Sequence, residues 1–139
     1  MRSLVVDDSP LIRLLLRRFL SGYGDCDEAK GGGDALAAFS KNITTERPYD
    51  LVCLDLQMPD TDGIHVLTGI RQIEKTHNRT TPVKVVVVTA ADDTTTVMQA
   101  LESGADGYLI KPISREALAS RLAVLFPDSH RSVFRSLET

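Results

Sequence analysis

Residues 83–89 read VKVVVVT, and this segment constrains the fold of the chain more than any other. After Lys84, no polar residue interrupts the run until Thr89. Valine favours extended backbone, and a strand without polar alternation is typical of one buried on both faces. Such strands occur in parallel sheets that helices cover on both sides. We therefore expect an α/β protein.

Other short strand-like runs alternate with segments of helical periodicity. The expected strands span residues 3–8, 26–29, 51–55, 83–89 and 106–110. The expected helices begin near residues 9–10, 31–33, 62–63, 92 and 114. In the first helix, the apolar face is expected to contain Leu11, Ile12, Leu15, Phe19 and Leu20. Five strands alternating with five helices predict a doubly wound, five-stranded parallel sheet.

The composition is that of an ordinary globular domain. Of the 139 residues, 42% are hydrophobic and 25% are charged, which suits one domain with one core. The formal net charge of −3 gives no sign of nucleic acid or a membrane surface as a partner, and no apolar run could span a bilayer. Cys26 and Cys53 lack metal-binding or redox spacing, and we expect a cytoplasmic protein.

Polar side chains stand where the expected strands end. Asp7 and Asp8 end the first strand, Asp55 the third and Thr89 the fourth, and Lys111 follows the fifth. Parallel strands gather such residues at one edge of the sheet, where ligands bind. Three neighbouring carboxylates repel one another, and Mg²⁺, which prefers oxygen ligands, relieves that repulsion. A metal, a lysine and a hydroxyl around one carboxylate can stabilise a phosphoryl group in transfer, with the carboxylate as nucleophile.

Four motifs together resemble the receiver domain of two-component response regulators. They are LVVDDS (4–9), LDLQMPDTDG (54–63), VVVVTA (85–90) and GYLIKPI (107–113). Each is weak alone, but all four occur in order, each at a strand. The resemblance covers about residues 3–126 and implies a flavodoxin-like sheet of strand order 2-1-3-4-5. We take 1–126 as the domain and 127–139 as a tail or the start of a linker, with a short helix left open.

The resemblance implies a phosphoryl site with a bound Mg²⁺. Asp55 matches the phosphoacceptor aspartate. Asp7 and Asp8 match the acid pair that holds Mg²⁺, with Asp8 the more direct ligand, and the metal also contacts Asp55 and the backbone carbonyl of Gln57.

The remaining motif residues match the switch machinery of the family. Thr89 matches the hydroxyl that binds a phosphoryl oxygen, and Lys111 matches the cation that pairs with the phosphoryl group. Tyr108 matches the aromatic residue that turns inward with the threonine, and Pro112 matches a proline that is usually cis. The implied readout surface consists of residues 92–103, 106–110 and 114–126.

The implied function is phosphorylation-dependent signalling, not enzymatic turnover of a substrate. A histidine kinase or phosphotransfer protein would donate the phosphoryl group, and the output would be binding to another protein, as a monomer or as a phosphorylation-dependent dimer. No output domain fits into residues 127–139, so the chain is expected to be either a single-domain regulator or an excised receiver. Met1, placed directly before the first strand, suits an intact N-terminus in both cases.

Several other conspicuous residues have structural explanations. Asp62 is expected to cap the next helix, and Gly63 to permit the bend before it. Asp60 is interpreted as a solvated loop acid, and His65 as a surface residue. The glycines at 31–33 lack the Lys-Ser/Thr pair of a phosphate-binding loop.

Gln57 and Ala91 occupy two positions that tune phosphoryl lifetime in the family, because they flank the path of the attacking water. Ala91 neither orients nor blocks that water, whereas Gln57 could do either. We expect an intermediate lifetime of minutes.

Two other functional classes stay open on the sequence alone. A metal-dependent hydrolase with an aspartyl-phosphate intermediate would need a second acid two residues after its nucleophile, where this chain has Gln57, and a cap domain. A flavin-binding protein would need a phosphate loop after the first strand, where this chain has Asp8-Ser9-Pro10.

Overall fold

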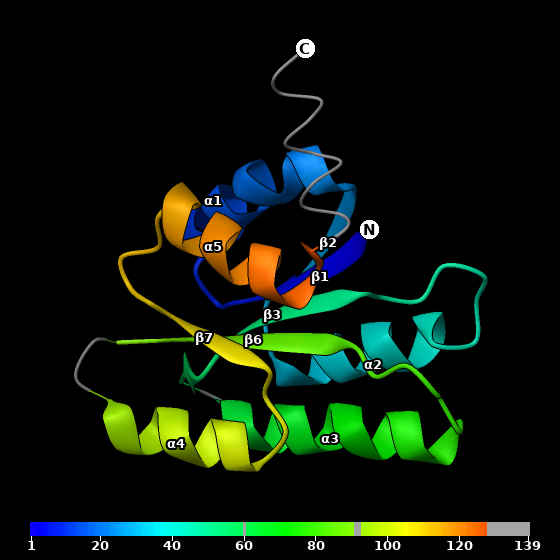
Figure 1. Cartoon of the computed structure of the whole chain (residues 1–139). Helices are drawn as coiled ribbons and strands as arrows, with labels where there is room; N and C mark the ends of the chain where they lie inside the picture. Colours follow the sequence, from blue (N-terminus) through cyan, green and yellow to red (C-terminus); the bar gives the residue numbers. More distant parts are fainter. Residues whose placement is uncertain (60, 91–92, 128–139) are drawn as a thin grey trace.

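The computed structural model describes residues 1–59, 61–90 and 93–127 (Figure 1). Its main sheet is parallel, with the strand order β2-β1-β3-β6-β7. The five strands are β1 (Arg2–Val6), β2 (Asp25–Ala29), β3 (Leu51–Asp55), β6 (Lys84–Thr89) and β7 (Gly107–Ile110). Counted within this sheet, the order is 2-1-3-4-5. The predicted flavodoxin-like α/β fold is therefore confirmed.

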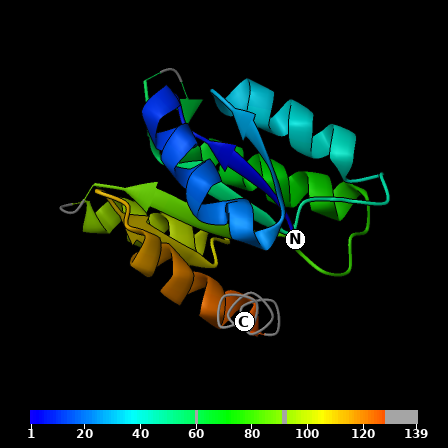
Figure 2. The same cartoon turned by 90° about the horizontal axis from the view of Figure 1, so that it is seen from above.

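Helices cover both faces of the sheet. They are α1 (Pro10–Leu20), α2 (Gly32–Asn42), α3 (Gly63–Thr76), α4 (Thr94–Glu102) and α5 (Arg115–Leu125), with a 3₁₀ turn, η1 (Ser21–Tyr23), after α1. Helices α1 and α5 lie on one face, and α2, α3 and α4 lie on the other (Figure 1). Figure 2 views the molecule from the α1 and α5 side. No helix within the described ranges has both the length and the apolar character needed to cross a membrane.

The core is two-layered because alternate residues of each central strand point to opposite faces. One cluster packs strand residues under α1 and α5: Val5, Leu51, Cys53, Val86, Val88 and Leu109. The other packs strand residues over α2, α3 and α4: Leu4, Val6, Val52, Leu54, Val85 and Val87. Burial of both faces, predicted from the valine run, is confirmed.

Side chains cap three of the helices at the positions where the sequence predicted that these helices begin. Ser9 Oγ accepts from the Ile12 N–H, and Ser114 Oγ accepts from the Ala117 N–H. Asp62 Oδ1 accepts from the Ile64 N–H at 3.0 Å, which confirms its predicted role as a cap. The bend after it needs glycine, because a Cβ on Gly63 would lie 2.7 Å from Leu56 Cα.

The structure corrects two strand predictions. The first strand ends at Val6, so Asp7 and Asp8 lie on the loop beyond it rather than within it. A two-stranded antiparallel ribbon, β4 (Gln57–Met58) with β5 (Thr61–Asp62), lies between β3 and α3 and was not predicted. Strands of two residues are too short to produce a hydrophobic period.

The predicted apolar face of α1 was partly wrong. Leu11 is 63% exposed, whereas Leu16 is 1% exposed and points into the core with Leu20. The apolar side of this helix is broad, so the sequence predicts which side is apolar but not which of its leucines lie deepest.

Some predictions concern residues outside the described ranges. These are the solvated role of Asp60, the role of Ala91, the start of α4 at Asp92 and the tail beyond residue 127. Within the described part, α4 begins at Thr94, and Asp93 caps it by accepting from the Thr96 N–H.

Glu74 joins α3 to the start of β6 and is the one buried glutamate in the described residues. Its Oε2 accepts from the Val83 N–H at 2.6 Å, and its Oε1 accepts from Arg71 Nη1 at 2.7 Å. Arg71 also donates to the Gly104 carbonyl, which ties α3 to the loop before β7. A buried carboxylate with partners of this kind is costly to remove.

We predict that Glu74→Ala lowers the free energy of unfolding by about 2–4 kcal/mol, because it leaves the buried Val83 N–H without its acceptor and removes the ion pair with Arg71. Urea denaturation measures this change. The matched control is Glu102→Ala on the exposed side of α4, which should change stability by less than about 0.5 kcal/mol. Equal effects of the two substitutions would contradict the assignment.

Candidate phosphoryl and metal site

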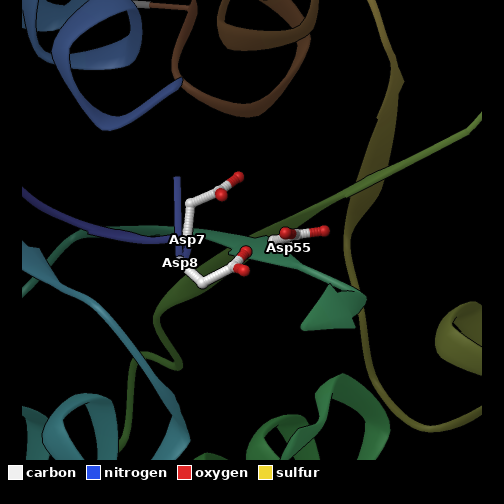
Figure 3. Close-up of side chains that lie close together, drawn as sticks. All are labelled: Asp7, Asp8 and Asp55. Atoms are coloured by element: carbon white, nitrogen blue, oxygen red, sulfur yellow. The ribbon is translucent and has the colours of Figure 1, made fainter. Parts of the chain in front are cut away.

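The carboxyl edge of the sheet brings three carboxylates together. Asp7 and Asp8 lie after β1, and Asp55 is the last residue of β3 (Figure 3). One oxygen from each carboxylate lies within 4.8 Å of the others. Asp7 and Asp55 are each 1% exposed, whereas Asp8 is on the surface. The sequence predicted this group from strand ends alone, and the structure places its members together.

One carboxylate oxygen of Asp7 is hydrogen-bonded to the backbone, and the other is not. Its Oδ1 accepts from the Ser9 N–H at 2.9 Å, and its buried Oδ2 has no hydrogen-bond partner in the described structure. Burial raises the pKa of Asp7 to about 6, the Ser9 amide lowers it, and the neighbouring Asp55 charge raises it. Without a cation, the folded protein therefore holds a proton here more tightly than an ordinary aspartate does.

Asp55 likewise has one bonded and one unbonded carboxylate oxygen. Its Oδ1 accepts from the Gln57 N–H at 2.9 Å and lies 3.5 Å from Lys111 Nζ. Its Oδ2 is buried and has no partner among the described residues. Lys111 Nζ also lies 3.9 Å from Asp7 Oδ2, so one ammonium faces both buried carboxylates.

Thr89 ends β6, and Lys111 directly follows the neighbouring strand β7 at the same edge of the sheet. The Thr89 side chain is fully buried, and its hydroxyl has no partner in the part of the chain that the structure describes. The Lys111 N–H donates to the Thr89 carbonyl at 2.8 Å, which ties the two residues together. The Lys111–Pro112 peptide bond is cis, in agreement with the predicted cis-proline.

Tyr108 lies one strand away from Thr89 and is half-buried. It lines a cavity of about 100 Å³ between β7 and the start of α4, together with Ala90, Asp93, Thr94, Val97 and Ile110. The Arg121 guanidinium of α5 lies 5.1 Å from the centre of its ring. Tyr108 therefore lies beside Arg121 of α5 and lines the same cavity as residues of α4.

The side chain of Gln57 makes contacts that the sequence did not predict. Its Oε1 accepts from the Ala90 N–H at 3.2 Å, and its Nε2 donates to Asp93 Oδ2 at 3.4 Å. Gln57 thus spans from the loop after β3 to the cap of α4. No sequence signal links positions 57 and 93, because the contact depends on how two loops meet.

The donor set fits a hard divalent cation. Two buried carboxylate oxygens, Asp7 Oδ2 and Asp55 Oδ2, have no partner in the described ranges, and Asp8 adds an exposed carboxylate. Oxygen ligands of this kind suit Mg²⁺. A cation here would also remove the repulsion among the three carboxylates.

A family model for the response regulator receiver domain matches residues 3–123. The chain belongs to the response regulator receiver domain family. Its relatives include the transcriptional regulatory protein ResD of Bacillus subtilis, 39% identical over 135 residues, and SrrA of Staphylococcus aureus, 33% identical over 123 residues. These matches cover 96% and 88% of this chain but 51% and 46% of the relatives, so this chain spans about half of their length.

Solved receiver structures share its architecture. A putative response regulator from Chloroflexus aurantiacus is 28% identical with a TM-score of 0.75, and the match covers 89% of this chain and 95% of that one. CheY in a CheX–CheY–BeF₃–Mg²⁺ complex from Borrelia burgdorferi is 26% identical with a TM-score of 0.78, covering 91% and 89%. Neither the family match nor these structures favour the hydrolase or the flavin-binding alternative.

The orphaned hydroxyl of Thr89 generates a stability prediction. We expect Thr89→Val to leave the free energy of unfolding unchanged or to raise it by up to about 1 kcal/mol, because it removes a buried polar group that has no partner among the described residues. Ser114→Ala, which removes a helix cap, should lower stability by about 1 kcal/mol in the same urea assay. A clear loss of stability in Thr89→Val would mean that the hydroxyl serves the fold.

Proposed function

We propose that Asp55 accepts a phosphoryl group from the phosphohistidine of a histidine kinase or phosphotransfer protein. The observation that carries this proposal is the environment of Asp55 Oδ2, a buried oxygen without a partner in the described structure, on a carboxylate 3.5 Å from Lys111. Family membership gives the reaction class.

Asp55 is the nucleophile of the transfer. One of its carboxylate oxygens attacks the phosphorus, a P–O bond forms, and the P–N bond to the donor imidazole breaks. The electron pair of that bond goes to the imidazole nitrogen, which takes up a proton. The product is an acyl phosphate on Asp55, and the donor leaves as neutral histidine.

The surrounding residues supply charge and orientation. Asp7, Asp8, Asp55 and the Gln57 carbonyl would hold Mg²⁺, which neutralises charge on the phosphoryl oxygens when bound. Lys111 pairs with one of those oxygens, and its place beside Asp55 requires no large movement. Thr89 donates its hydroxyl to another oxygen and so gains the partner that it lacks in this structure.

The proposed output surface is the edge formed by α4, β7 and α5. Thr89 is joined to Lys111 on the neighbouring strand, and Tyr108 of that strand contacts α5 through Arg121. Phosphorylation biases an existing two-state equilibrium of these elements. The surface presents the exposed apolar side chains of Met98, Leu101, Ile110 and Val124 for a protein partner, or for a second copy of the phosphorylated domain.

Labelling with a small acyl phosphate and Mg²⁺, followed by intact mass spectrometry, tests the proposal. The wild-type protein should gain one phosphoryl group, and Asp55→Asn should gain none. Asp62→Asn is the matched control, because it removes an acid from the same loop while asparagine still caps α3. Equal labelling of the wild type and Asp55→Asn would overturn the assignment of Asp55.

We also predict that the acyl phosphate lasts for minutes. The amide of Gln57 already bonds Ala90 and Asp93, so it neither supplies a base for the attacking water nor fills the site with bulk. Removal of the phosphodonor, followed by timed mass spectra, measures the decay. A half-life of many hours would contradict this prediction.

A further inference from the structure

Asp8 occupies an unusual position for a metal ligand, because its own side chain is not anchored. It is on the surface, and no hydrogen bond or ion pair of its carboxylate occurs within the described ranges. Nevertheless its carboxylate lies within 4.8 Å of Asp7 and Asp55 oxygens. Its approach to the site must therefore be set by the backbone that carries it.

That backbone is held at the peptide between Asp7 and Asp8. The Asp7 N–H donates to the Ala29 carbonyl at 3.1 Å, which fixes one side of the residue to β2. The Asp7 carbonyl, which belongs to the peptide that leads into Asp8, accepts from Arg13 Nη1 at 2.7 Å. The guanidinium thus sets the orientation of the peptide plane that leads to Asp8.

Arg13 is itself held rigidly. Its Nε donates to Glu28 Oε1 at 3.1 Å, and its side chain is 14% exposed. Glu28 uses its other oxygen to accept from Arg17 Nη1 at 2.9 Å, one helical turn further along α1. A chain of contacts therefore runs from the edge strand β2 through Glu28 and Arg13 to the acid pair.

We propose that Arg13 is a positioning residue for the divalent cation, acting through the Asp7 carbonyl to hold Asp8 at the site. The proposal rests on the Mg²⁺ site of the proposed function. Groups that orient metal ligands in this way commonly change metal affinity by an order of magnitude or more.

The charge of Arg13 and its positioning role predict opposite effects on Mg²⁺ binding. A guanidinium that contacts the Asp7 backbone next to the site repels an incoming cation, so its charge alone weakens Mg²⁺ binding. If charge were its only influence, removing it would strengthen Mg²⁺ binding. If Arg13 positions Asp8, removing it weakens Mg²⁺ binding despite the loss of repulsion.

The test is the Mg²⁺ dissociation constant of the unphosphorylated protein, measured by calorimetric titration. Arg13→Gln should raise the constant about tenfold. Arg17→Gln is the matched control, since it removes an arginine of α1 and an ion pair to Glu28 without touching Asp7; it should change the constant by less than about twofold. In Arg13→Lys, the ammonium can reach either the Asp7 carbonyl or Glu28 but not both. Its Mg²⁺ dissociation constant should therefore fall between those of Arg13→Gln and the wild type.

The outcomes separate the two proposals. If the wild type binds no Mg²⁺, the metal site of the proposed function is wrong. If the wild type binds Mg²⁺ and Arg13→Gln binds it equally well or more tightly, the positioning role is wrong. Urea denaturation of each variant checks that it is folded. If Arg13→Gln does not fold, Arg13→Lys takes its place in the test. A Mg²⁺ dissociation constant of Arg13→Lys equal to that of the wild type then overturns the positioning role.

Discussion

The repulsion among Asp7, Asp8 and Asp55 is the constraint on which the site depends. The parallel sheet forces these residues to one edge, and the core behind them prevents two of the three from turning to water. Lys111 offsets part of the charge and lies closer to Asp55 than to Asp7. The remaining deficit of positive charge suits a hard divalent cation such as Mg²⁺, which prefers oxygen ligands.

The sequence was sufficient for the features that follow from periodicity and strand order. The valine run of β6 predicted a sheet covered on both faces, and the acids at the strand ends predicted a common edge. Capping by Ser9, Asp62 and Ser114 was readable because it is local chemistry. Residue roles came from resemblance to a family, since no spacing rule distinguishes a phosphoacceptor from a metal ligand.

Contacts between distant segments were not readable from the sequence. Arg13 is one of several arginines on α1, and only the placement of β2 beside β1 brings it to Glu28. Gln57 reaches Asp93 because two loops meet above the sheet. The burial of Leu16 in place of Leu11 depends on rotation of a helix whose apolar side is broad. In each case tertiary geometry, not local pattern, decides the outcome.

The strand order has a consequence for how different parts of the domain open. Strand β3, which carries Asp55, has a neighbour on each side, whereas β7 is bonded only to β6 and forms an edge. We therefore expect amide protons on β3 to exchange with solvent more slowly than those on β7, where local opening suffices. The proposed phosphoacceptor thus belongs to a central strand, and the proposed output surface includes an edge strand. Phosphorylation of a central strand would then alter the surface around the edge strand without loosening the part of the sheet between them.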